Sequence, residues 1–112
     1  MKLHDIAHGR SGDKGNKANV GIIATDRDDF PFLRDLLTEA YVAAVFEAFL
    51  EEPGVESVDR YILPKMGGLN FVLHGALDGG ASESLRTDRQ GKTFAAMLLR
   101  QEIDDEYEGF RD

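Results

Sequence analysis

Six periodic segments follow one another along this chain in the order strand, strand, helix, strand, strand, helix, and this order restricts the fold more than any other feature. We assign a strand where apolar residues alternate or form a short run, and a helix where they recur every three or four residues. The expected bounds are strands at 3–8, 18–24, 57–63 and 69–73, one helix at 32–51, and a last helix from residue 88 or 91 to 103.

The order of these segments predicts an α+β fold with two layers. A right-handed crossover through helix 32–51 makes the second and third strands parallel, so an antiparallel sheet needs one strand between them. Strands 18–24 and 69–73 are the most apolar, and we place them at the centre. The prediction is a ββαββα sandwich, a permuted ferredoxin-like fold with strand order 1-2-4-3 and both helices on one face. The alternative order 2-1-3-4 would place the polar first strand at the centre.

The length of 112 residues predicts a single domain, which we place at 1–103, followed by an acidic and frayed tail at 104–112. The formal charge of −8 argues against nucleic acid and anionic membranes as partners. The absence of cysteine excludes disulfides and thiolate chemistry. Because the first residues lack a signal-peptide pattern and no apolar run approaches membrane-spanning length, we expect a cytoplasmic protein.

A polar segment with two glycines, Arg10-Ser11-Gly12-Asp13-Lys14-Gly15-Asn16, separates the first two expected strands. Gly12 and Gly15 can adopt positive φ, and a turn built in this way can aim several backbone N–H groups at one anion. Arg10 and Lys14 would add positive charge beside it. The segment therefore predicts an anion-binding turn, with an ordinary hairpin loop as the alternative.

The expected topology brings further cations to the same end of the sheet. If the first strand runs toward the glycine turn, then the segment 75–92 and the start of the last helix lie beside that turn. The cations that would gather there, next to a helix N-terminus that favours anions, are Arg10, Lys14, Arg86, Arg89 and Lys92. The alternative is that these are solvated loop charges paired with nearby acidic residues.

Four other polar residues are candidates for a site. His4 and His8 lie ~13 Å apart if both are in one strand, which argues against a shared metal ion, and we expect no metal site. Asn70 lies within an apolar strand, where a buried amide must find a partner, so it either ties the sheet to a loop or reaches a ligand. His74 lies near the end of the same strand and is most simply structural.

Several of these segments together resemble the small ferredoxin-fold domain of the AtuA family, named for acyclic terpene utilisation. The resemblance covers residues 4–103 and is carried by 10–16, 18–21 (Ala-Asn-Val-Gly), 69–71 (Leu-Asn-Phe), Gly79-Gly80, and 84–92 with its Ser-Leu-Arg, Asp88 and Gln-Gly-Lys. In that family the domain is either the C-terminal part of a longer protein or a short chain beside a large one. The resemblance implies catabolism of branched or terpenoid acids as coenzyme A thioesters.

We therefore expect an accessory subunit that docks on a large AtuA-like protein and contributes a glycine-rich loop to a shared site. The chain alone would form a homo-oligomer through the helix-free sheet face. No cofactor is expected, and the ligand would be a coenzyme A thioester. The expected ligand-binding residues are Arg10, Ser11, Gly12, Asp13, Lys14, Gly15, Asn16, Asn19, Asn70, Arg86 and Lys92.

Two alternatives belong to other classes of function. The first is a small, self-sufficient acyl-CoA hydratase or isomerase in which Asp13 or His74 transfers protons. The second is a structural oligomerisation domain in which the glycine segment is only a turn.

Overall fold

The computed structural model describes residues 1–14, 17–52, 54–76 and 90–103. The elements in chain order are η1 (Leu3–Asp5), β1 (Ala7–Lys14), β2 (Lys17–Ala24), η2 (Arg27–Asp29), α1 (Phe30–Leu36), α2 (Glu39–Val45), η3 (Glu47–Phe49), η4 (Val55–Ser57), β3 (Val58–Leu63), β4 (Gly68–His74) and α4 (Gln90–Leu99), where η marks a 3-10 helix. The expected tail at 104–112 lies outside the described residues.

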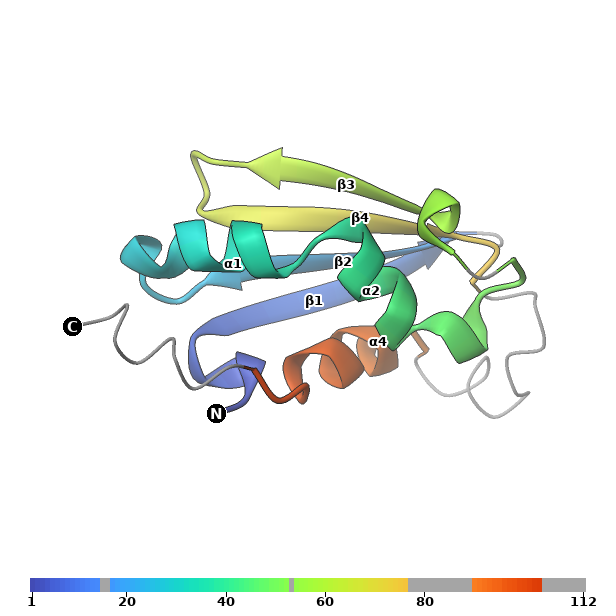
Figure 1. Ribbon diagram of the computed structural model, residues 1–112, viewed down its shortest axis with the longest axis horizontal. Coiled ribbons are helices and arrows are strands. Elements are labelled where there is room, and N and C mark those ends of the chain that lie inside the picture. Colours follow the sequence, from blue (N-terminus) through green and yellow to red (C-terminus); the bar gives the residue numbers. More distant parts are fainter. Residues whose placement is uncertain (15–16, 53, 77–89, 104–112) are drawn as a thin grey trace.

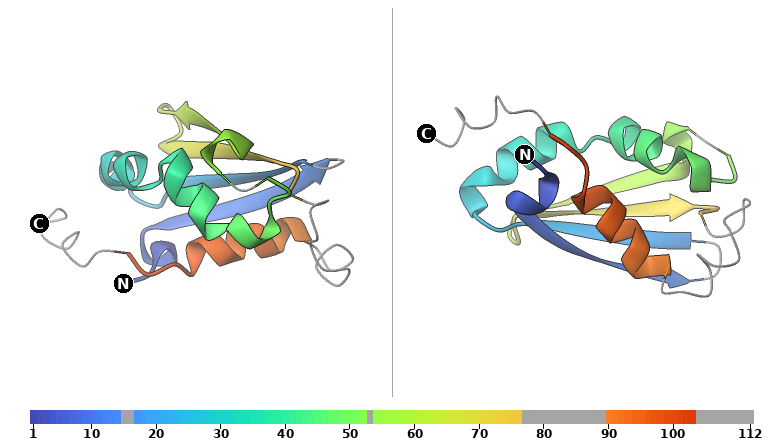
Figure 2. Two further views of the ribbon diagram at one scale, coloured as in Figure 1. Left: turned by 45° about the vertical axis from the view of Figure 1, so that its right-hand side comes forward. Right: turned by 90° about the horizontal axis from the view of Figure 1, so that it is seen from below.

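The four strands form one antiparallel sheet in the order β1-β2-β4-β3 (Figure 1). The predicted strand order and the ferredoxin-like α+β fold are thereby confirmed. β1 and β3 lie at the two edges, and β2 and β4 lie at the centre. Helices α1, α2 and α4 pack over one face of this sheet, and the two views in Figure 2 show them on the same side.

Burial alternates along the central strands because the described helices all pack on one face of the sheet. On β2 the side chains of Val20 and Ile22 are fully buried, and on β4 Phe71 and Leu73 are fully buried. These side chains meet an aromatic cluster under the helices, in which Phe94 of α4 makes an edge-to-face contact with Phe46 at a centroid distance of 5.4 Å. The intervening residues of each strand face away from the helices.

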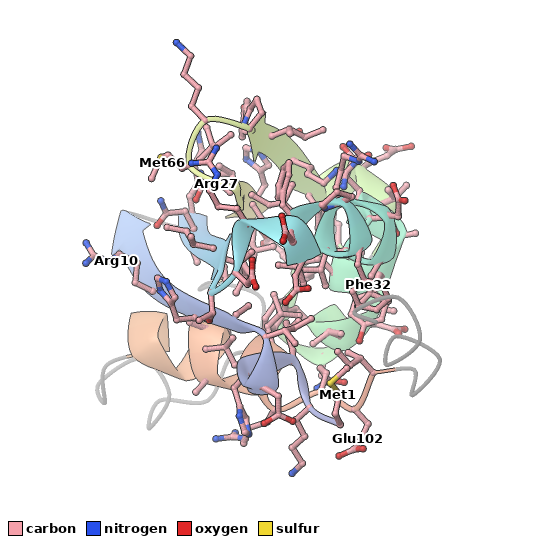
Figure 3. All side chains as sticks on the ribbon, turned by 90° about the vertical axis from the view of Figure 1, so that its left-hand side faces the viewer. Met1, Arg10, Arg27, Phe32, Met66 and Glu102 are labelled. Atoms are coloured by element: carbon pink, nitrogen blue, oxygen red, sulfur yellow. The ribbon has the colours of Figure 1, made fainter. Side chains whose placement is uncertain are left out.

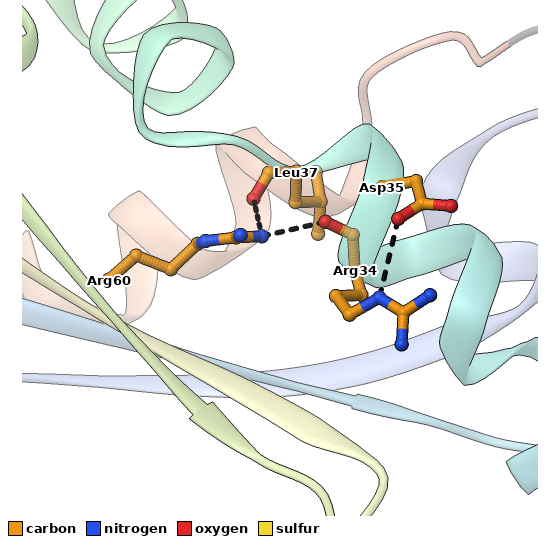
Figure 4. A network of polar contacts seen from close by, with 4 residues as sticks. All are labelled: Arg34, Asp35, Leu37 and Arg60. Carbon is orange, nitrogen blue, oxygen red and sulfur yellow. Dashed lines mark hydrogen bonds and ion pairs between the residues drawn. The ribbon is translucent and has the colours of Figure 1, made fainter.

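The prediction of one continuous helix at 32–51 is wrong, because α1 ends at Leu36 and α2 begins at Glu39. Leu37 leaves the helical conformation, with φ −89° and ψ 72°. Thr38 then caps α2, since its hydroxyl accepts a hydrogen bond from the Tyr41 amide at 3.1 Å. Arg60 of β3 holds the break by donating from Nη1 to the carbonyls of Arg34 at 2.6 Å and Leu37 at 3.0 Å (Figure 4).

The prediction that residues 10–16 form a turn is also wrong for its first part, because β1 continues through Lys14. The residues from Ala7 to Lys14 pair one by one with Ala24 to Lys17. Residues 3–5 form the 3-10 helix η1, so the first strand begins four residues later than predicted. Position 9 of this strand has room only for glycine, because a Cβ atom there would lie 2.5 Å from the Gly21 carbonyl oxygen.

Both ends of the folded chain meet beside η1. The Leu3 amide donates to the Gln101 carbonyl at 3.0 Å, and the Ile103 amide donates to the Met1 carbonyl at 2.8 Å. The segment that makes these bonds follows α4, which ends at Leu99 rather than at the predicted residue 103. None of the helices in the described ranges is long and apolar enough to cross a membrane.

We predict that Arg60→Ala lowers the free energy of unfolding by about 1–3 kcal/mol, since two carbonyls at the end of α1 lose a charged donor. Urea unfolding followed by circular dichroism measures this change. Arg34→Ala is the matched control, because its guanidinium makes only an exposed ion pair with Asp35, at 3.3 Å, and its removal should cost less than about 0.5 kcal/mol. Equal losses in the two variants would contradict the role assigned to Arg60.

Candidate functional site

The sheet face opposite the described helices contains a hollow of about 960 Å³. The size lies within the range of small-molecule sites, which is about 300–1,000 Å³. Figure 3 shows Arg10 of β1 and Met66 of the β3–β4 loop on the side of the sheet away from Phe32 of α1. The hollow is lined by His8, Gly9, Arg10, Ser11, Gly12, Asn19, Gly21, Ile23, Tyr61, Leu63, Met66, Leu69 and Asn70.

The hollow exists because its floor lacks large side chains and its rims have them. One cross-strand row runs from Arg10 through Gly21 and Asn70 to Tyr61. Gly21 leaves the centre of this row without a side chain, whereas Tyr61 and Met66 rise at the β3 side, with 51% and 55% of their surfaces exposed. The result is a concave surface with a basic rim along β1 and an apolar rim along β3.

Two asparagine amides lie on this floor, each beside a glycine of the neighbouring strand. The Asn19 side-chain oxygen would lie 3.0 Å from a Cβ atom at Gly12, and the Asn70 side-chain oxygen would lie 3.7 Å from one at Gly21. Neither amide makes a hydrogen bond to another residue in the described part of the chain. Asn70 therefore does not tie the sheet to a described loop, and both amides are available to a ligand or a partner.

Ser11 faces the opposite side of the sheet from Arg10. Its hydroxyl accepts a hydrogen bond from the Ala95 amide of α4 at 2.8 Å, so it holds the last helix against β1. Ser11 therefore borders the hollow with its backbone and not with its side chain. Successive N–H groups of a strand point to opposite sides, so residues 10–14 do not converge on one anion as a turn would.

The structure describes only part of the expected basic cluster. The end of β1 at Lys14 and the start of α4 at Gln90 lie at the same end of the sheet (Figures 1 and 2), as the predicted strand direction requires. Arg10 is exposed on the open face. The side chains of Asp13, Lys14 and Lys92, and residues Gly15, Asn16, Arg86 and Arg89, lie outside what the structure describes.

His74 has a partner that was not predicted. Its Nε2 atom lies 2.7 Å from Oδ2 of Asp59 on the adjacent strand. Both side chains lie on the open face next to the hollow and are partly exposed, His74 by 39% and Asp59 by 50%.

Across the described ranges, no three His, Asp or Glu side chains come close enough to hold a metal ion. Burial raises the pKa of Tyr41, which belongs to α2 on the helix side of the sheet.

A family model for the AtuA ferredoxin-like domain matches residues 1–104 of the chain. The chain belongs to the AtuA ferredoxin-like family. The predicted recognition is thereby confirmed, and it covers all four strands and the helices that pack on them. Comparison with curated proteins and with solved structures finds no match.

Much of the hollow in this AtuA ferredoxin-like domain was missed in the sequence, although a signal for it exists. Asn19, Gly21 and Ile23 alternate with the buried residues of β2, and Tyr61 and Leu63 alternate with Arg60 and Ile62 on β3. The period of two therefore assigns them to the open face. Their arrangement as one floor and two rims depends on the strand register, which the alternation alone does not supply.

We predict that Gly9→Ala lowers the free energy of unfolding by about 1–3 kcal/mol, because the added methyl group meets the Gly21 carbonyl oxygen and the Ile22 side chain. Gly21→Ala is the matched control on the open face. Its methyl group would have ordinary contacts at 3.7 Å or more, and alanine restricts the unfolded chain, so a gain of about 0.5 kcal/mol is expected. Chemical denaturation of both variants tests the difference, and a destabilised Gly21→Ala would contradict the open floor.

Proposed function

We propose that this domain is a companion subunit of a larger AtuA-like protein in the catabolism of branched or terpenoid acids as coenzyme A thioesters. The observation that carries the proposal is the hollow of about 960 Å³ on the sheet face that no described helix covers. Membership of the AtuA ferredoxin-like family supports the proposal, because the resemblance implies a domain that is either the C-terminal part of a longer protein or a short chain beside a large one.

The apolar rim supports docking of a protein on this face. Tyr61, Leu63 and Met66 expose 51%, 36% and 55% of their surfaces and stand together at one side of the hollow. Large apolar side chains that gather on one exposed face mark interaction sites. The glycine floor allows the backbone of a partner to come close, and the free amides of Asn19 and Asn70 supply hydrogen bonds to it.

The basic end of the sheet supports an anion subsite in the same complex. Arg10 lies on the open face, and Lys14 ends β1 where α4 begins with Lys92 in its first turn. A phosphate or carboxylate group of the thioester would bind there, with Arg86 as a further candidate from outside the described residues. Guanidinium and ammonium groups bind such anions by charged hydrogen bonds.

A self-sufficient enzyme is the second candidate, and the pair formed by His74 and Asp59 favours it. A carboxylate 2.7 Å from an imidazole holds the ring in one orientation. The exposed edge of the ring could then exchange a proton with an acyl thioester bound on the open face. Turnover of crotonyl-CoA or a branched enoyl-CoA by the chain alone would support this candidate, and His74→Gln should abolish it.

The docking proposal is tested by purifying the tagged chain from its own host and identifying whether a large AtuA-like protein is bound to it. We expect a stable complex, and Tyr61→Asp should weaken it by about 30-fold or more, since a charged carboxylate would be buried in the apolar rim. Val55→Asp is the matched control, because Val55 is an exposed apolar residue of η4 outside the hollow. No complex, or equal weakening by both substitutions, would refute docking through this face.

We also predict that the isolated chain associates with itself through the open face at high micromolar concentration, because the apolar rim is otherwise in water. Sedimentation velocity across a concentration series measures the association. Tyr61→Asp should give a monomer and Val55→Asp should not. A clean monomer for the unaltered chain at high micromolar concentration would contradict the prediction.

A further inference from the structure

A second surface lies along the outer edge of β1, separate from the floor of the open-face hollow. Within the described residues β1 pairs with β2 alone, so its other edge is free. Its pairing with β2 runs without a bulge over Ala7–Lys14, and no proline interrupts it. Proline and bulges are two of the ways in which proteins block a strand edge, and the described part of β1 has neither of them, while α4 packs on its helix-facing side through the bond from Ala95 to Ser11.

The strand register identifies the backbone groups on this edge. The Thr25 amide donates to the Ile6 carbonyl at 2.9 Å, and antiparallel pairs alternate between bonded and non-bonded positions. His8 and Arg10 therefore bond to β2, whereas the N–H and C=O groups of Gly9 and Ser11 point outward. These outward groups can form hydrogen bonds with an added strand.

A groove of about 520 Å³ runs along the same edge, between β1 and α4. Gly9 and Ser11 form one wall, and Ala95, Ala96 and Leu99 form the other. The hydrogen bond from the Ala95 amide to the Ser11 hydroxyl fixes the distance between the walls. Because all these side chains except Leu99 are small, the groove has room for side chains of an added strand on its helix-facing side.

Charge identifies the kind of strand that fits. Arg10 is the single charged residue among the described residues that line the groove, and the neighbouring His8 shares its face of β1. Residues directly opposite each other on paired strands interact, and opposite charges are favoured. A strand added to β1 therefore gains most from an acidic side chain opposite Arg10 and from aliphatic side chains opposite Gly9 and Ser11.

A second copy of β1 does not meet this requirement. When two copies pair with their helices on the same side of a continuous sheet, each residue meets one from the same face of the other strand. The residues that share this face with Arg10 are His8, Gly12 and Lys14, none of them acidic. No such register places an acidic residue opposite Arg10.

We propose that the outer edge of β1 and the groove beside α4 bind an extended peptide segment of a partner protein by strand addition, with acidic and aliphatic residues alternating in that segment. Main-chain hydrogen bonds from Gly9 and Ser11 supply affinity, as in other complexes of this type. Arg10 and the groove select the sequence. This surface is distinct from the apolar rim at Tyr61, so substitutions can separate the two.

The first test is amide hydrogen exchange by NMR on the full chain. In the free protein the amides of Gly9 and Ser11 should exchange faster than those of His8 and Arg10, which bond to β2. Protection of Gly9 and Ser11 in the free protein would mean that another part of the chain, or a second copy, already pairs with this edge. That result overturns the proposal.

The second test is selection from a phage-displayed library of random linear octapeptides on the full chain. The selected peptides should alternate acidic and aliphatic residues, protect the amides of Gly9 and Ser11, and bind about tenfold more weakly when an alternate amide is N-methylated. Ala96→Trp, which fills the groove, should weaken binding at least about tenfold. Ala40→Trp on α2 is the matched control, since Ala40 is an exposed helical alanine far from β1.

Recovery of no binding peptide overturns the proposal. Peptides without acidic residues, or peptides whose binding is insensitive to Ala96→Trp but lost in Tyr61→Asp, also overturn it, because they would place the contact on the open face. Urea unfolding of Ala96→Trp shows whether the variant is folded. If it is not, Leu99→Glu at the end of the groove replaces it with the same expected loss.

Discussion

The pairing of β2 with β4 at the centre of the sheet is the interaction on which the rest of the structure depends. Val20 pairs with Phe71 and Ile22 pairs with Leu69, and all four side chains are buried under the helices. A shift of one residue would turn Gly21 and its neighbours into the core and expose these side chains. The register that builds the core is therefore also the register that leaves glycine and asparagine on the open face.

The strand order could be predicted because a right-handed crossover requires one strand between the second and the third, and because segments 18–24 and 69–73 are the most apolar. The break between α1 and α2 could not be predicted with the same ease, because Arg60 stabilises it from a strand far along the chain. A local signal did exist at Thr38, since threonine followed by a helical segment is a common N-cap. The wide apolar stripe across residues 32–51 concealed it.

The glycine segment shows why the candidate site was predicted only in part. Glycine is typical of turns, and composition alone does not distinguish a turn from a strand that another backbone approaches closely. Gly12 of the segment is of the second kind, since it pairs with Asn19 on β2 and a Cβ atom there would lie 3.0 Å from the Asn19 side-chain oxygen. Likewise, His74 was recognisable as a polar residue near a strand end, but its partner Asp59 is found only from the pairing of β3 with β4.

The polar residues of β1 face three different surroundings. Ser11 bonds to α4 on one face, Arg10 borders the hollow on the other, and the backbone of Gly9 and Ser11 points to the free edge. An apolar strand at this position would bury nothing on its open face and would expose an aggregation-prone edge. Substitutions within β1 therefore alter more than one surface at once. The opposite walls, Tyr61 for the hollow and Ala96 for the groove, are the positions at which the two surfaces can be changed one at a time.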